Sequence, residues 1–141
     1  MNSRANMRRN LQILLGVFGA VCISIALTHI FFGPSSIPGS IPVNATMDSE
    51  DRFYATLFLG FGATLLWCVR SVERKSTVVY ALMVIFFLGG VSRVISIVAV
   101  GFPNALFVFL TVVELVLPFV ISYMLYRTTR MTALPVVKDD G

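Results

Sequence analysis

Four long apolar stretches, separated by short polar segments, account for most of the chain. They cover about residues 11–32, 52–69, 77–100 and 105–126. A helix of about 20 apolar residues is long enough to cross the hydrocarbon core of a bilayer. Each stretch is near that length, and proline or charged residues interrupt the sequence between them. The pattern therefore predicts an all-α fold, a four-helix transmembrane bundle that forms one membrane domain over residues 11–126.

The composition agrees with a chain whose surface faces lipid. Of its 141 residues, 57% are hydrophobic and 13% are charged, whereas soluble domains average roughly 45–50% and about 25%. The net charge of +4 is held in short clusters beside apolar runs. Such clusters are typical of membrane anchoring and not of a nucleic-acid-binding face. We therefore expect no nucleic-acid partner and no sizeable soluble domain.

The residue types needed for a metal or cofactor site are scarce. The chain has one histidine and two cysteines, Cys22 and Cys68, which fall at different depths of separate helices. These residues do not make a zinc ligand set, and one histidine cannot supply both axial ligands of a b-type haem. The sequence also has no phosphate-binding loop and no Ser-His-Asp order. We predict no cofactor and no metal, and we assign no catalytic residue.

Lysine and arginine are distributed unequally between the two sides of the predicted bundle. Three precede the first helix, three lie in residues 70–75 and three follow residue 126, against one in residues 33–52. Cytoplasmic segments of membrane proteins carry an excess of these residues. We therefore expect both termini in the cytoplasm, with residues 1–10 as a cytoplasmic N-terminus and residues 131–141 as a disordered cytoplasmic tail.

The first apolar run follows three arginines, an order that signal peptides share. A signal peptide has an apolar region of about 7–15 residues and ends in a small-residue cleavage site. This run is longer and ends in the poor cleavage site Thr28–Phe32, so we expect it to be retained as a spanning helix.

A Pro- and Gly-rich loop over residues 33–42 follows, and Asp48 or Ser49 is expected to cap the second helix.

Two ionisable residues lie deep inside apolar runs, Arg93 in the third and Glu114 in the fourth. An arginine at the centre of a spanning helix costs roughly 2.5–3.5 kcal/mol on insertion scales, so it normally finds a partner, water or a function. A helix rises about 1.5 Å per residue, which places Arg93 about 10 Å and Glu114 about 14 Å below the turn that joins these helices. We expect the two to face each other inside the bundle. They form either a structural ion pair or part of a ligand or proton site.

Further polar residues fall at the same outer side of the bundle. Arg52 begins the second helix, and His29 lies one turn from the end of the first. We predict a pocket there, roofed by Ile37 and Ile41 of the Pro-rich loop and favouring an anionic head group because of its two arginines. In the alternative, acids of the same loop neutralise Arg52 first. The residues of this hypothetical ligand site are Arg52, Arg93, Glu114, His29 and Tyr54.

Two motifs carry a resemblance to a known family. They are Glu50-Asp51-Arg52-Phe53-Tyr54-Ala55-Thr56-Leu57-Phe58-Leu59-Gly60 and Phe87-Leu88-Gly89-Gly90-Val91-Ser92-Arg93-Val94-Ile95-Ser96, and a Gly-Phe-Pro turn follows the second. From its first helix to its fourth, the chain resembles a family of small bacterial four-helix integral membrane proteins catalogued as domain of unknown function 4345. The resemblance implies a four-helix fold in a bacterial inner membrane and carries no activity.

Three functions fit these observations. The first is a small, non-enzymatic membrane protein that binds a lipid-like or amphipathic molecule, or that joins a second copy or a larger membrane complex as an accessory subunit. The second is a small transporter or ion-path component that uses Arg93 and Glu114. The third is an intramembrane enzyme acting on a lipid or quinone. Size favours the first, because four helices enclose little volume and the chain has no clear internal repeat. A Glu114 held by arginine would also be a weak general base.

Overall fold

Four long helices make up the fold of residues 2–130, the part of the chain that the computed structural model describes. The helices are α1 (Asn2–Phe32), α2 (Ala45–Val69), α3 (Ser76–Val100) and α4 (Ala105–Arg130), and a short 3-10 helix, η1 (Gly33–Ser36), follows α1. Each long helix is long and apolar enough to cross a membrane. The predicted four-helix architecture is confirmed, while the tail predicted at 131–141 lies outside the described residues.

Helix α2 begins earlier than the apolar pattern indicates. Its first residue is Ala45, and its N-cap is Asn44, whose side-chain oxygen accepts a hydrogen bond of 3.0 Å from the backbone N–H of Met47. The expectation that Asp48 or Ser49 caps this helix is wrong. An amide oxygen satisfies the exposed N–H group one turn earlier, and the two expected caps lie inside the helix.

Helices α1 and α2 form a hairpin that closes on two glycines. A Cβ atom built on Gly62 would lie 2.8 Å from the carbonyl oxygen of Gly19, and one built on Gly19 would lie 2.9 Å from the carbonyl oxygen of Gly62. Gly16 of α1 and Gly60 of α2 have open space where a Cβ atom would be. The backbones of α1 and α2 therefore approach most closely where both helices lack a side chain.

Helices α3 and α4 form a second hairpin with its own glycine contact. A Cβ atom on Gly90 would lie 3.0 Å from the Cβ atom of Glu114. The turn between these helices uses Gly101 at φ +110°, a conformation that favours glycine. Asn104 then begins α4 by accepting a hydrogen bond of 3.0 Å from the backbone N–H of Leu106.

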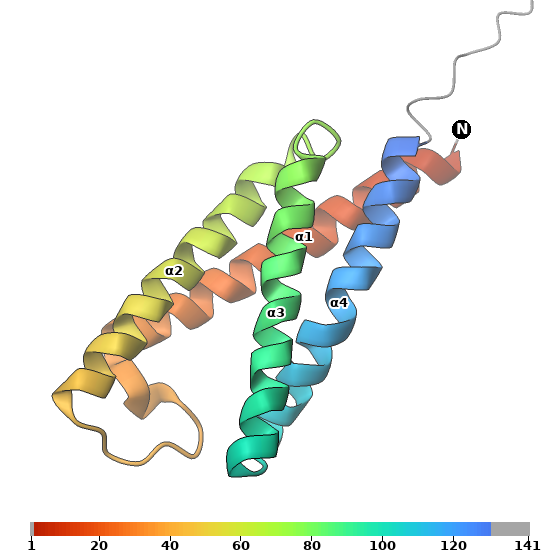
Figure 1. Ribbon diagram of the computed structural model, residues 1–141. Coiled ribbons are helices and arrows are strands. Elements are labelled where there is room, and N and C mark those ends of the chain that lie inside the picture. Colours follow the sequence, from red (N-terminus) through yellow and green to blue (C-terminus); the bar gives the residue numbers. More distant parts are fainter. Residues whose placement is uncertain (1, 131–141) are drawn as a thin grey trace, which may run out of the picture.

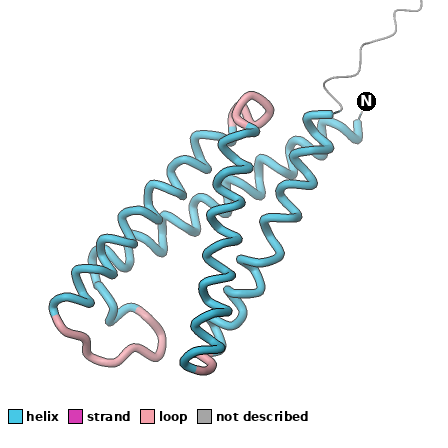
Figure 2. The backbone as a smooth tube through the Cα atoms, viewed as in Figure 1, coloured by secondary structure: helices cyan, strands magenta, loops and turns pink. Residues whose placement is uncertain are grey.

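The two hairpins pack together at one end of the molecule and diverge toward the other (Figure 1). The packed end contains the connection between α2 and α3, together with both ends of the described chain (Figure 2). The connections at 33–44 and 101–104 lie at the opposite end. The buried apolar core accordingly gathers in the converging half, and its residues are Leu11, Leu15, Phe18, Cys22, Leu65, Cys68, Val72, Val79, Met83, Ile121 and Leu125.

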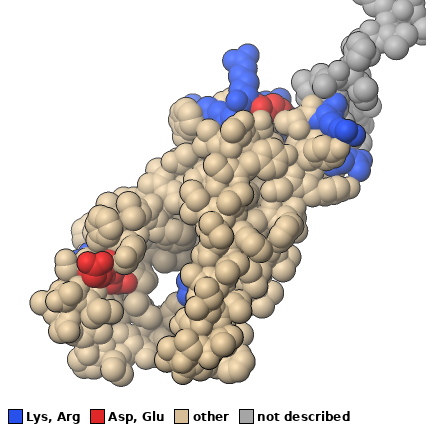
Figure 3. Space-filling model, in the orientation of Figure 1, with Lys and Arg blue, Asp and Glu red and all other residues tan. Residues whose placement is uncertain are grey.

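The converging end is also where lysine and arginine gather (Figure 3). Helix α1 starts there at Asn2, so it extends through the basic segment that precedes the apolar run. Arg8 forms an ion pair of 2.9 Å with Glu73 of the α2–α3 connection. Gln12 donates a hydrogen bond of 2.7 Å to the carbonyl oxygen of Val69. The first hairpin is therefore tied to the connection that leads into the second.

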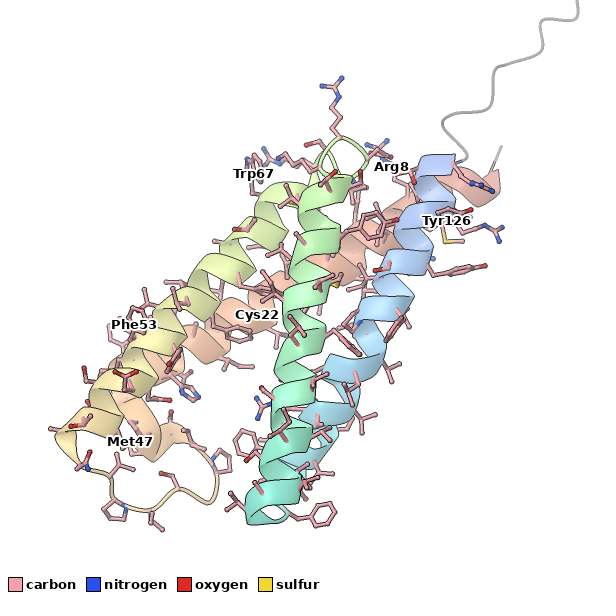
Figure 4. The ribbon with its side chains drawn as sticks, in the orientation of Figure 1. Arg8, Cys22, Met47, Phe53, Trp67 and Tyr126 are labelled. Atoms are coloured by element: carbon pink, nitrogen blue, oxygen red, sulfur yellow. The ribbon has the colours of Figure 1, made fainter. Side chains whose placement is uncertain are left out.

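Aromatic side chains accompany the basic ones at this end (Figure 4). The Lys75 ammonium lies 3.4 Å from the centre of the Trp67 ring, and the Arg130 guanidinium lies 4.9 Å from the centre of the Tyr126 ring. Trp and Tyr beside Lys and Arg are typical of the boundary between lipid and water. Between the two ends the outer surface is apolar, with exposed large hydrophobic side chains on all four helices. Such a surface fits a chain surrounded by lipid.

Candidate functional site

A cavity of about 670 Å³ opens between the two hairpins, on the side of the core where they diverge. All four long helices contribute to its wall, and the space-filling view shows the hollow between them (Figure 3). Its rim is open, since Tyr54 of α2 and Ile85 of α3 line it while staying 61% and 58% exposed. The cavity is a consequence of the divergence of the hairpins.

The wall formed by α3 and α4 carries the predicted ion pair. The Nε–H group of Arg93 donates to both carboxylate oxygens of Glu114, at 2.9 Å and 2.7 Å. The Glu114 side chain is nearly buried, whereas that of Arg93 is 38% exposed toward the cavity that it lines. The geometry therefore brings together the two residues that depth along the helices predicts to meet.

Glycines and an aromatic ring hold this pair in place. Gly90 lets α4 approach α3 at the level of Glu114, and a Cβ atom on the neighbouring Gly89 would lie 4.0 Å from a Glu114 carboxylate oxygen. The Arg93 guanidinium lies 5.4 Å from the centre of the Phe107 ring, a cation–π distance. Larger residues in place of the two glycines would fill the space into which the pair extends.

The wall formed by α1 and α2 carries a second polar pair, between His29 and Asp51. The Nδ1 atom of His29 lies 3.0 Å and 3.2 Å from the two carboxylate oxygens of Asp51. Both side chains line the cavity and are about one-fifth exposed. The sequence prediction included His29 but missed Asp51. Asp51 lies about two turns into α2 because that helix begins at Ala45, earlier than the apolar pattern indicates.

Arg52 lies outside the cavity, contrary to the prediction. Its Nε–H group donates to a carboxylate oxygen of Asp48 at 2.8 Å, and a second guanidinium nitrogen donates to the other oxygen at 3.1 Å. The remaining nitrogen donates to the carbonyl oxygen of Ile30 near the end of α1. A Cβ atom at Gly33 would collide with this arrangement. Arg52 thus joins the start of α2 to the end of α1, and the alternative in which a nearby acid neutralises it describes the structure.

An aromatic cluster closes the inner end of the cavity. The ring centre of Phe18 lies 4.7 Å from that of Phe86 and 5.9 Å from that of Phe61, so three helices meet there. At about 1.5 Å of rise per residue, Phe86 lies about 10 Å from Arg93 along α3. The cavity is therefore polar toward the 33–44 loop and apolar toward the middle of the bundle.

The Pro-rich loop does not roof this cavity. Ile37 and Ile41 line a separate hollow of about 470 Å³ together with Pro103 and Asn104 of the α3–α4 turn. Ile41 remains 77% exposed. The predicted roof is wrong because the loop crosses toward the turn that follows α3 instead of covering the space between the hairpins.

Metal-ligand geometry is not found in the described part of the chain. Residues 2–130 contain no group of three or more His, Cys, Asp or Glu side chains that could hold a metal ion. Cys22 lines the cavity with a free thiol, and Cys68 is buried in the core, also as a free thiol. The polar groups that the cavity offers are therefore the Arg93–Glu114 ion pair and the hydrogen-bonded His29 and Asp51, above an aromatic floor.

The fold and this cavity define a small polytopic membrane protein with a polar-lined space between two helical hairpins. The chain belongs to the family described as Domain of unknown function (DUF4345), whose sequence profile matches residues 10–125. The resemblance noted from the sequence motifs is thereby confirmed. No curated protein and no solved structure matches the chain.

Proposed function

We propose that the protein is a non-enzymatic membrane protein that binds a lipid-like or amphipathic molecule in the cavity between its two hairpins. The observation that carries this proposal is the cavity itself, which has the Arg93–Glu114 ion pair and the His29–Asp51 hydrogen bond near one end and a phenylalanine cluster at the other. Small-molecule sites are mostly apolar concavities of about 300–1,000 Å³ with a few placed polar groups. An amphipathic molecule has a polar part and an apolar part that match the two ends of this cavity.

The same geometry argues against a carboxylate of the cavity as the acid or base of an intramembrane enzyme. An enzyme needs an acid or base free to exchange a proton with its substrate. Both carboxylates in the cavity are already engaged, Glu114 with Arg93 and Asp51 with His29. A carboxylate on Nδ1 is also how enzymes orient a histidine that acts through Nε2, so these contacts argue against Glu114 and Asp51 as that acid or base and not against His29.

Filling the cavity should abolish amphiphile binding. Gly89→Phe places a ring in the space beside Glu114, while Gly60→Phe makes the same change on α2, where the glycine does not line the cavity and has open space around it. After purification in mild detergent, we expect the wild type and Gly60→Phe to retain a stoichiometric lipid or other amphiphile and Gly89→Phe to lose it. Mass spectrometry of the extracted molecules and of co-purifying proteins provides the measurement.

The alternatives give other results in that experiment. If all three proteins retain the same molecules in the same amounts, the cavity is not the binding site. A stoichiometric partner protein without any retained amphiphile would favour an accessory subunit of a larger membrane complex. Self-association of the purified chain would instead favour a homo-oligomer.

We also propose that the protein lies in the bacterial inner membrane with both termini in the cytoplasm. Three groups of lysine and arginine lie in the N-terminal segment, the α2–α3 connection and the segment after residue 126, and cytoplasmic segments are enriched in these residues. Reporter fusions at Gly141 should be active in the cytoplasm, and fusions within residues 35–40 should be active outside it. An external reporter at Gly141 would contradict this orientation.

A further inference from the structure

The Arg93 guanidinium has hydrogen-bond donors to spare inside the cavity. Arginine carries five N–H groups, and Arg93 uses the one on Nε for both oxygens of Glu114. Within residues 2–130, no side chain or backbone oxygen accepts a hydrogen bond from its two Nη atoms. These four N–H groups belong to a side chain that lines the cavity and is 38% exposed. In a membrane, water or a bound molecule must satisfy them.

The carboxylate oxygens that line the cavity, in contrast to the Nη atoms of Arg93, already have hydrogen-bond partners. Both oxygens of Glu114 accept from Arg93, and both oxygens of Asp51 face His29 Nδ1. A cationic head group would have to compete with these internal partners. An anionic head group would find the unused donors of Arg93. Among the described residues that line the cavity, Arg93 is the only arginine, and there is no lysine. Planar or tetrahedral oxyanions suit paired guanidinium N–H groups.

The apolar part of the cavity fixes the direction of the rest of the molecule. From Arg93 the wall continues toward Phe86, about 10 Å along α3, and there Phe18 and Phe61 complete the floor. This floor lies toward the converging end, where the core is packed. The polar end lies toward the 33–44 loop, so polarity changes along the cavity as it does along one leaflet of a bilayer.

We propose that the cavity holds a single acyl chain that ends in an oxyanion, with the oxyanion hydrogen-bonded to the Nη atoms of Arg93 and the chain directed toward Phe86. The oxyanion is a fatty-acid carboxylate or the phosphate of a single-chain lipid, two sources of the same chemistry. This assignment of the ligand class rests on the proposed function. Arg93 is then a binding residue, and Glu114 orients it.

Four probes separate the elements of this proposal. Delipidated protein in non-ionic detergent is titrated with oleate, oleoyl lysophosphatidate, oleyl alcohol or inorganic phosphate, and native mass spectrometry measures the bound fraction. We expect one molecule of oleate or of the lysophosphatidate per chain, at least about tenfold tighter than oleyl alcohol. The tighter of these two identifies the source of the oxyanion. Inorganic phosphate, which lacks a chain, should bind at least about tenfold more weakly than either.

Matched variants test the role of Arg93. Arg93→Gln should weaken the binding of the preferred anion by about tenfold or more, whereas Arg52→Gln, which also deprives a carboxylate of its arginine but lies outside the cavity, should leave it within about twofold. Arg93→Gln combined with Glu114→Gln leaves no unpaired charge and should show the same loss if the single variant does not fold. Oleyl alcohol should bind equally to all of these proteins.

The outcomes distinguish this inference from the proposed function. If oleyl alcohol binds the wild type as tightly as oleate and the lysophosphatidate, or if Arg93→Gln and Arg52→Gln lose equal affinity, the oxyanion proposal is overturned while amphiphile binding stands. If no chain-bearing probe binds the wild type, both proposals are overturned.

Discussion

Replacing Arg93 by leucine should destabilise the folded protein by about 3 kcal/mol. The variant leaves Glu114 charged and nearly buried in α4 with no basic partner, and breaking one side of a buried pair typically costs about 3–5 kcal/mol. The lower end of that range applies because the pair borders an open cavity. The measurement is the free energy of unfolding in mixed micelles, obtained by titration with a denaturing detergent and followed by circular dichroism.

A second substitution distinguishes a lost pair from a lost side chain. Arg93→Leu combined with Glu114→Leu removes both charges, and apolar replacement of a buried pair is often neutral or stabilising. We expect this double variant to recover most of the lost stability while losing the bound anion. A single variant as stable as the wild type would show that the ion pair contributes nothing to the fold.

Adding one methyl group at Gly62 should also weaken the fold, by about 1–3 kcal/mol, the usual cost of overpacking. The Cβ atom of alanine would lie 2.8 Å from the carbonyl oxygen of Gly19 and 2.9 Å from Ile23. A backbone carbonyl cannot rotate away as the end of a side chain can, so α1 and α2 must separate. Since their hairpin forms one wall of the cavity, we also expect weaker amphiphile binding.

Gly60→Ala on the same helix is the matched control. It adds the same methyl group where no atom lies within 4 Å, and alanine favours helix over glycine by roughly 0.5–1 kcal/mol. We therefore expect opposite signs for the two variants in the same unfolding titration. A stable Gly62→Ala protein would show that the close approach of the two glycines is not needed for the hairpin.

The Arg93–Glu114 contact could be predicted from the sequence because it depends on few variables. Arg93 precedes and Glu114 follows the same short turn. The rise of about 1.5 Å per residue therefore fixes the depths of the two residues relative to each other. Antiparallel helices joined by a short turn are also neighbours. Thr111, Glu114 and Pro118 recur at helical spacing along α4, and all three are buried.

Depth alone could not place Arg52, because it does not specify the direction of a side chain around its helix. Arg52 lies at the expected end of α2 but turns to Asp48 and the carbonyl oxygen of Ile30. Its sequence neighbour Asp51 points into the cavity instead and contacts His29. With Asp48 as the expected cap, Asp51 would lie in the first turn of α2. Because Asn44 caps the helix instead, Asp51 lies inside it.

The cavity itself could not be derived from hydrophobic periodicity. Its existence depends on how far two hairpins diverge, and that follows from where large side chains fill the space between them. The core residues from Leu11 to Cys22 and from Val79 to Met83 lie in the converging half. Apolar residues at the other end, such as Val98 and Val100, are more than 80% exposed instead. Sequence pattern shows both groups simply as apolar.

The arrangement of charged pairs has a consequence for biosynthesis. A membrane chain is inserted in the order of its synthesis, so α1 and α2 enter the bilayer before α3 and α4 exist. The first pair of helices contains the contacts of Arg52 with Asp48 and of His29 with Asp51, and the second pair contains that of Arg93 with Glu114. Each of these ionisable side chains has its partner in its own half. An intramembrane charge is costly when unpaired, and here the insertion machinery can release each half with these charges already matched.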